Sequence, residues 1–142
     1  MAPILFHGSA KKIGSGFLLP NIPSDLSKRK NLRGVYATNV RAIALGMAIA
    51  SIRGIEGFAD YESRPFKFVL VNGSPKGSVY LYTLPKKGFK EEPKRSGQFI
   101  SPERVRILSV EKLGVEKLGR YWRKATAKEK KWFLGFTHKH SV

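Results

Sequence analysis

The chain lacks cysteine, has few acidic residues and contains no long apolar run. Without cysteine, disulfides, thiolate catalysis and cysteine-based zinc sites are excluded. No window approaches the roughly 20 apolar residues that a membrane-spanning helix needs, and the start has no basic region followed by a long apolar one. We therefore expect a cytoplasmic protein without a signal peptide or a membrane span.

Acidic residues are far outnumbered, with 10 Asp and Glu against 27 Lys and Arg and a formal net charge of +17. Such an excess concentrates polyanions around a surface. We expect contact with nucleic acid or a ribonucleoprotein through the basic residues of one loop and of the tail, namely Lys28, Arg29, Lys30, Arg120, Arg123 and Lys124. The same charge also fits a very soluble protein, an acidic protein partner or an anionic lipid surface.

The length of 142 residues and the hydrophobic content of 42% predict one compact domain with a continuous core. Within it we distinguish residues 1–110 as the main unit and residues 111–142 as a basic, aromatic helical segment packed on the same domain. The pattern of segments is α+β, with two small antiparallel sheets forming a cleft and one long buried helix.

The first part of the chain predicts two short strands, residues 3–7 stopping at Gly8 and residues 34–38, separated by a long loop that ends at Arg33. A loop of this length inside a compact domain is uncommon unless it has a function. We expect it to lie over the phosphates of a ligand.

A helix follows, with Asn39 as its N-cap, extending to about Arg53, where Gly54 ends it. It is apolar nearly all round, which predicts burial between layers. Residues 54–65 are expected to form a second loop.

Two β-rich runs, residues 66–71 and 78–83, predict an antiparallel hairpin, and residues 98–100 and 104–108 predict further strands. The tail looks weakly helical over residues 115–124.

The last segment begins with a capping box, Thr126 to Glu129, ahead of an aromatic helix. We expect Trp122 and Trp132 to dock the tail onto the sheet, because buried aromatic rings repay the ordering of a helix, rather than to stack on bases.

Three short segments carry a family resemblance: His7-Gly8-Ser9, Gly34-Val35-Tyr36-Ala37-Thr38 and Gln98-Phe99-Ile100-Ser101. Together they resemble diphtheria-toxin-like and poly(ADP-ribose) polymerase-like ADP-ribosyltransferases over most of the first 110 residues. The resemblance implies an ADP-ribosyltransferase-like fold and NAD as the substrate.

The resemblance also implies roles for single residues. His7 would bond a ribose hydroxyl of NAD, and the Gly8 backbone would pair with the nicotinamide carboxamide. The ring of Tyr36 would stack on the nicotinamide, since an aromatic face holds a planar cationic ring. The neighbouring hydroxyls of Ser9 and Thr38 belong to the same implied NAD site.

Met47 stands where poly(ADP-ribose) polymerases carry a second tyrosine. It could form an apolar wall of the nicotinamide pocket, but plain core packing is the favoured explanation. Nothing in the sequence implies a metal.

Gln98 stands where the family has its catalytic glutamate. Cleavage of the bond between nicotinamide and ribose passes through an oxocarbenium-like state, which a carboxylate stabilises. Gln98 can form hydrogen bonds but brings no charge. Three readings stay open: a mono-transferase that uses a hydrogen-bonding residue, a carboxylate supplied from elsewhere, or a domain without catalysis. The candidate carboxylates are Asp60, Glu62, Glu91, Glu92 and Glu103.

The leading hypothesis is a mono-ADP-ribosyltransferase for a macromolecular, polyanionic target, with Gln98, Tyr36 and His7 as its catalytic group. The alternative is a catalytically inactive, basic nucleic-acid-binding protein with the same fold. A tRNA 2′-phosphotransferase of related fold ranks lower, because its arginine-histidine pattern is not visible.

Overall fold

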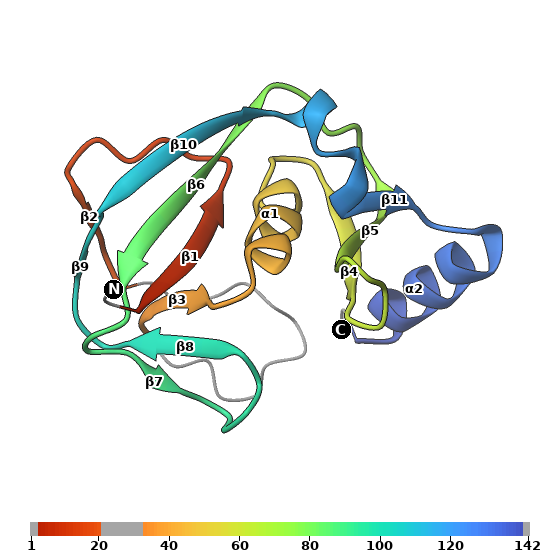
Figure 1. The fold of residues 1–142 in the computed structure, drawn as a ribbon. Coiled ribbons are helices and arrows are strands. Elements are labelled where there is room, and N and C mark those ends of the chain that lie inside the picture. Colours follow the sequence, from red (N-terminus) through yellow and green to blue (C-terminus); the bar gives the residue numbers. More distant parts are fainter. Residues whose placement is uncertain (1–2, 21–32, 141–142) are drawn as a thin grey trace.

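The computed structural model describes residues 3–20 and 33–140, and side chains as far as residue 135. Over these residues the chain is α+β and mostly antiparallel, with two α-helices and three sheets (Figure 1). No helix in the described ranges is long and apolar enough to cross a membrane.

The largest sheet has six strands in the order β10-β6-β1-β3-β8-β7. Their bounds are β10 Ser109–Gly114, β6 Ser78–Pro85, β1 Ile4–Ser9, β3 Val35–Thr38, β8 Gln98–Ser101 and β7 Lys90–Glu91. All five neighbouring pairs are antiparallel.

The second sheet has three strands in the order β11-β5-β4, with the bounds β11 Trp122–Lys124, β5 Lys67–Asn72 and β4 Glu56–Asp60. Here β11 runs parallel to β5. A two-stranded ribbon pairs β2 (Phe17–Leu18) with β9 (Val105–Arg106).

Helix α1 (Arg41–Ala50) lies between the six-stranded and the three-stranded sheets (Figure 1). Its buried residues Ala44, Leu45, Ala48 and Ile49 form one core with residues of β5 and β6 and with Val115 and Leu118. The predicted burial of this helix between layers is therefore confirmed. Because both sheets bury a face against it, α1 needs apolar residues nearly all round.

The ends of α1 differ from the prediction. Its N-cap is Val40 rather than Asn39, and the Thr38 hydroxyl accepts the Val40 N–H at 3.0 Å. It ends at Ala50 rather than Arg53, because the Ser51 hydroxyl donates to the carbonyl of Ala48 at 2.8 Å and closes the last turn.

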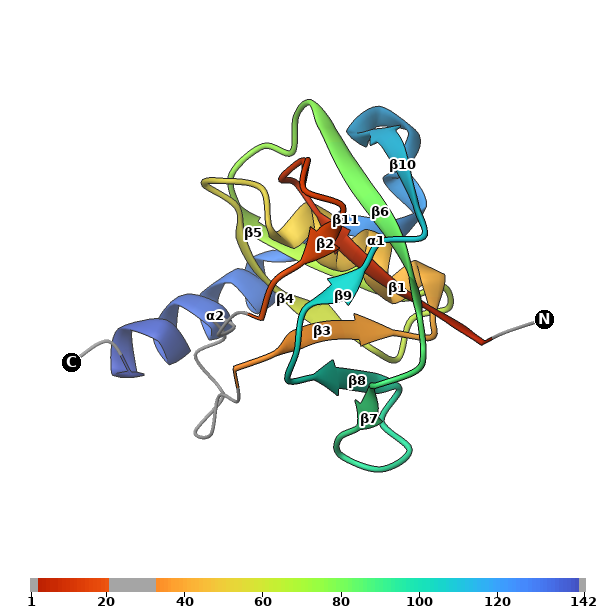
Figure 2. The same ribbon diagram turned by 90° about the vertical axis from the view of Figure 1, so that its left-hand side faces the viewer.

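A second core lies on the opposite face of the six-stranded sheet, under the ribbon β2–β9 (Figure 2). It contains Leu5 and Tyr82 of the sheet and Leu18 and Val105 of the ribbon. The sheet is thus covered on both sides, which explains the continuous apolar run of β6.

Several predicted boundaries are wrong. β1 continues through Gly8 to Ser9, and the long loop after it contains β2. The expected loop over residues 54–65 contains β4. The strand expected over residues 104–108 is reduced to β9. The strand expected at 98–100 is confirmed as β8.

The predicted hairpin of residues 66–71 and 78–83 is also wrong. β5 and β6 belong to different sheets, and the chain between them crosses from one to the other (Figure 1). β6 pairs instead with β1 and β10.

The C-terminal part holds two 3₁₀ turns, η1 (Val115–Lys117) and η2 (Gly119–Tyr121), before β11 and helix α2 (Ala127–His140). The continuous weak helix expected over residues 115–124 is therefore replaced by turns and a strand. The boundary predicted after residue 110 falls inside β10.

The capping box is confirmed. The Glu129 N–H donates to the Thr126 hydroxyl at 3.1 Å, and the Thr126 N–H donates to the Glu129 carboxylate at 2.9 Å. Docking is confirmed for Trp122, which packs half-buried against the core of α1. Trp132 stays 58% exposed and meets the ring of Phe58 edge-on.

Candidate functional site

Strands β1, β3 and β8 are neighbours in the six-stranded sheet, so the three segments of the family resemblance lie side by side. The register pairs Phe6 with Thr38 and Thr38 with Gln98, and it pairs Tyr36 with Ile100. Residues paired across an antiparallel ladder point to the same face. Tyr36, Thr38 and Gln98 therefore share the face that α1 covers.

The ladder between β1 and β3 is short: in the described chain, Phe6 and Thr38 are its one pair. Continued by two residues, the same register would join Gly8 to Tyr36. Pro3 accepts the N–H of Lys86 at 3.2 Å, so the odd-numbered residues of this strand direct their backbone groups toward β6. By alternation, Gly8 directs its N–H and C=O toward β3, where the ladder has ended.

His7 reaches Tyr36 at this point. Its Nδ1 lies 2.6 Å from the Tyr36 carbonyl oxygen. A carbonyl only accepts, so Nδ1 carries the hydrogen. Burial lowers the pKa of His7 below its ordinary value, and the hydrogen bond to Tyr36 opposes this shift. The imidazole is therefore neutral near pH 7 and its Nε2 is a hydrogen-bond acceptor.

The side chains of His7 and Tyr36 leave the sheet on opposite faces. His7 pairs with Tyr82 of β6, and the two rings lie 6.2 Å apart on the side of the ribbon β2–β9. Tyr36 belongs to the face of α1. His7 contacts the backbone carbonyl of Tyr36 and not its ring. The imidazole and the phenol ring therefore do not converge on one point.

Gly8 also has a packing role. A Cβ at this position would clash with the carbonyl oxygen of Ala44 and the Cβ of Ala48. Glycine is thus what allows α1 to lie directly on β1. Met47 is half-buried and follows Ala44 by three residues, which places it on the same side of α1.

The two hydroxyls of the resemblance form local hydrogen bonds. The Ser9 hydroxyl accepts the N–H of Lys11 at 3.1 Å. Thr38 is buried, at 8% exposed, and bonds the start of α1 as described above. Gln98 is half-buried, and its amide nitrogen donates to the Glu92 carbonyl at 2.9 Å. The amide oxygen is the acceptor end of this side chain.

The candidate replacement carboxylates are spread over the molecule. Glu91 accepts the N–H of Gly97 at 2.9 Å and closes the turn before β8. Asp60 bonds Ser63 and pairs with Arg123 on the three-stranded sheet. Glu62 and Glu92 are exposed. Glu103 lies beyond the far end of β8 from Gln98. In the described part of the chain, no three His, Asp or Glu residues gather as a metal site.

The basic residues proposed for nucleic acid also differ among themselves. Lys28, Arg29 and Lys30 lie outside the described residues. Arg120 and Lys124 are exposed. Arg123 is not available, because its guanidinium forms two hydrogen bonds of 2.7 and 2.8 Å to the Glu129 carboxylate.

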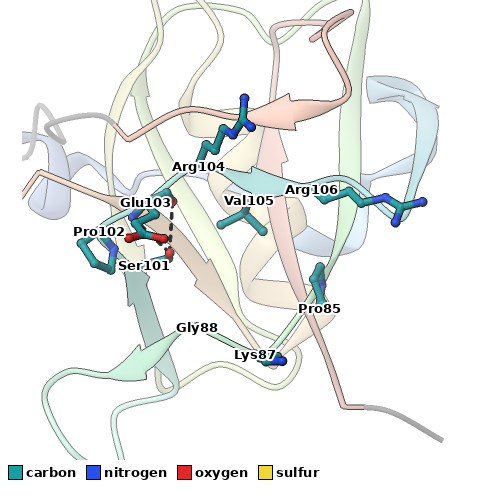
Figure 3. Close-up of a pocket in the computed structure, with 9 residues that line it drawn as sticks. All are labelled: Pro85, Lys87, Gly88, Ser101, Pro102, Glu103, Arg104, Val105 and Arg106. Atoms are coloured by element: carbon teal, nitrogen blue, oxygen red, sulfur yellow. Dashed lines mark hydrogen bonds between the residues drawn. The ribbon is translucent and has the colours of Figure 1, made fainter.

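A pocket of about 400 Å³ lies at the opposite end of β8 from Gln98 (Figure 3). Its lining includes Ser101, Val105, Lys87, Arg104 and Arg106. The guanidinium groups of Arg104 and Arg106 extend away from the cavity, and Lys87 lies on the side opposite Arg104 (Figure 3). Sequence reasoning missed this basic cluster. The alternation of Arg104, Val105 and Arg106 was its available signal.

Comparison with protein-family models, curated proteins and solved structures gave no match, so the likeness to ADP-ribosyltransferases stands on the residues of the chain itself.

Proposed function

We propose that this protein is an ADP-ribosyltransferase that binds NAD where the β1–β3 ladder ends and transfers a single ADP-ribose to a macromolecular, polyanionic target. The observation that carries the proposal is the order β1, β3, β8. It sets His7, Tyr36 and Gln98 on adjacent strands although they are far apart in the sequence.

The groups at the ladder's end fit a nicotinamide nucleotide. A carboxamide offers a donor and an acceptor side by side, which matches the C=O and N–H that Gly8 directs toward β3. The neutral His7 accepts a ribose hydroxyl hydrogen at Nε2, while Tyr36 holds Nδ1 in place. Tyr36 offers a half-buried aromatic face on the side of α1. NAD, when bound, supplies the ADP-ribosyl group and nicotinamide as the leaving group.

Gln98 limits the chemistry. Its amide oxygen accepts a hydrogen bond from a ribose hydroxyl and so orients the sugar, but it adds no negative charge beside the carbon at which the bond breaks. We therefore expect slow transfer. A hydrogen-bonding residue in place of the family's glutamate also fits a mono-transferase, so we expect single transfer.

Titration calorimetry with NAD tests the binding step. Tyr36→Ala should weaken NAD binding by up to about tenfold, the value of a lost aromatic contact, whereas Tyr36→Phe should retain it. Tyr61→Ala removes a tyrosine that is 61% exposed in the segment between β4 and β5 and serves as the matched control. If NAD does not bind, or if all three variants bind it equally, the proposal is wrong.

Gln98→Glu tests the catalytic step. A carboxylate at this position should raise the transfer of labelled ADP-ribose at least about tenfold while NAD affinity stays within about twofold, because the charge acts on the transition state. Gln98→Ala is the control and should lose activity. Unchanged transfer in the glutamate variant would place the catalytic centre elsewhere.

The second candidate function is nucleic-acid binding without catalysis. The net charge of +17 and the guanidinium groups on the ribbon β2–β9 favour it. It predicts steeply salt-dependent binding of RNA or DNA that survives the double change His7→Ala, Tyr36→Ala. The transferase hypothesis predicts that the same change abolishes NAD binding.

A further inference from the structure

The ribbon β2–β9 has two unlike faces. Leu18 pairs with Val105, and both are buried in the core beneath, at 3% and 6% exposed. Phe17 pairs with Arg106 and so shares the other face, which is turned away from the core. Arg104 comes just before β9 and is exposed like Arg106. The outer side of the ribbon therefore carries one aromatic ring and two arginines.

The Arg104 guanidinium lies over this ring. Its guanidinium carbon lies 4.5 Å from the centroid of Phe17. Stacking uses one face of the guanidinium and leaves its in-plane N–H groups free to point outward. Because Arg104 is exposed, a second planar ring can also reach its guanidinium.

The turn before β9 fixes the position of these arginines. The Ser101 hydroxyl donates to the Glu103 carbonyl at 3.0 Å and accepts the Glu103 N–H at 3.3 Å (Figure 3). Ser101 itself is buried, at 4% exposed. Arg104 thus starts from a fixed backbone, which lowers the entropy lost when a ligand binds.

Neither arginine has an acidic partner in the described part of the chain, where the ion pairs within 4.0 Å involve Arg41 and Arg123. Lys87 adds a third positive charge on the far side of the pocket, and Glu103, which also lines it, adds one negative charge. The arrangement offers forked N–H donors, which match the oxygens of a phosphate, on an exposed planar group, which matches a base.

We propose that the outer face of the ribbon, formed by Phe17, Arg104 and Arg106, binds the phosphates of a single-stranded nucleic acid while one base stacks on the Arg104 guanidinium. A duplex hides the faces of its bases, so a single strand fits better. An acidic peptide would use the N–H groups but would not stack on the planar group. This surface is distinct from the end of the β1–β3 ladder, and the inference does not depend on NAD chemistry.

Fluorescence anisotropy with labelled oligo(dT) and oligo(U) strands of about 12 nucleotides tests the proposal without NAD present. The double variant Arg104→Gln, Arg106→Gln should bind both strands at least about tenfold more weakly, and its salt slope should fall by about 1.4, or about 0.7 for each lost phosphate contact. Lys128→Gln, Lys131→Gln is the matched control: it removes two exposed charges from α2, which lies beyond the three-stranded sheet (Figure 1), and should weaken binding far less.

Arg104→Lys, Arg106→Lys keeps both charges but not the planar group, so it should recover the salt slope and only part of the affinity. If the Arg→Gln double variant and the Lys→Gln control lose the same affinity for the strands, binding depends on the total charge of the protein and not on this surface, and the proposal is wrong. Loss of binding to anionic vesicles or to a poly-glutamate peptide, with strand binding unchanged, would overturn it as well. NAD affinity measured on the same variants should stay unchanged, which separates this result from the transferase test.

Discussion

Two regions of the molecule combine arginine with aromatic side chains, and they use these residues differently. At the C-terminal end, Arg123 is clamped by the Glu129 carboxylate and lies 3.7 Å from Asp60. On the ribbon β2–β9, Arg104 stacks on Phe17 without a carboxylate partner among the described residues. The first arginine joins a strand to a helix, whereas the second keeps its hydrogen-bond donors exposed.

The difference shows that whether a basic residue of this chain is available to a ligand depends on its partners within the fold. Arg123 connects β11, β4 and the capping box of α2, so its charge is neutralised inside the fold. The acidic residues are few, and several of them serve structural pairs of this kind. The excess positive charge is therefore left on surfaces such as the ribbon, where polyanions are attracted.

The largest effect on stability is expected for Arg123→Ala. The substitution removes a bidentate pair that is about one third exposed and leaves Glu129 without its main partner, which should cost about 2 kcal/mol of the free energy of unfolding. Urea denaturation measures this value. Arg41→Ala is the control, because the Arg41–Glu111 pair is half exposed and should be worth less than about 1 kcal/mol. Equal costs for both variants would break the comparison.

A second effect is expected in acid. The Arg123 guanidinium and the Thr126 N–H lower the pKa of Glu129 to about 2 from an ordinary 4.5. A depressed carboxylate pKa gives stability that is present above pH 4.5 and is lost as the pH falls toward 2. Wild type should therefore lose stability over this range.

Glu129→Gln should lose less over the same range, and the two proteins should converge near pH 2 in thermal melts. Asp60, whose pKa is also lowered, remains in both proteins and contributes equally. Parallel curves for wild type and variant would show that Glu129 is not the group responsible.

The smallest effect on stability is expected for Arg104→Gln, Arg106→Gln. Both side chains are exposed and have no acidic partner among the described residues, so the free energy of unfolding should change by less than about 0.5 kcal/mol. The same urea titration measures it. If the double variant loses as much free energy of unfolding as Arg123→Ala, the ribbon arginines stabilise the fold, and the contrast between the two groups of arginines is wrong.

Local signals predicted the elements whose cause is local. The capping box of α2 is visible as Thr126 and Glu129 three residues apart, and the buried α1 follows from its apolar surface. β8 follows from its alternating pattern. The α+β class needs no more than these elements.

Pairing between distant strands was not readable. β5 and β6 are both apolar and joined by a glycine-rich turn, which favoured a hairpin, yet each is buried on two faces and its run of apolar residues does not reveal its neighbour. β4 was missed because Gly57 resembles a loop residue. A Cβ there would clash with the carbonyl of Val69, so glycine is what lets β4 approach β5.

The candidate site also has features that the sequence predicted and features that it could not predict. The sequence placed His7, Tyr36 and Gln98 at the ends or starts of strands, and the adjacency of those strands agrees with that placement. The register could not be read, and it puts the side chains of His7 and Tyr36 on opposite faces. The ribbon escaped notice because β2 and β9 are two residues each and gain their structure from the core beneath them.

The parallel pairing of β11 with β5 means that the central strand of the three-stranded sheet receives one neighbour from more than fifty positions further along the chain. Shortening the protein after residue 110 would strip that neighbour away and also cut β10 in two. The backbone N–H and C=O groups on that edge of β5 would then be unpaired, and an unpaired strand edge promotes intermolecular aggregation. An engineer who wants a minimal version of this protein should trim elsewhere.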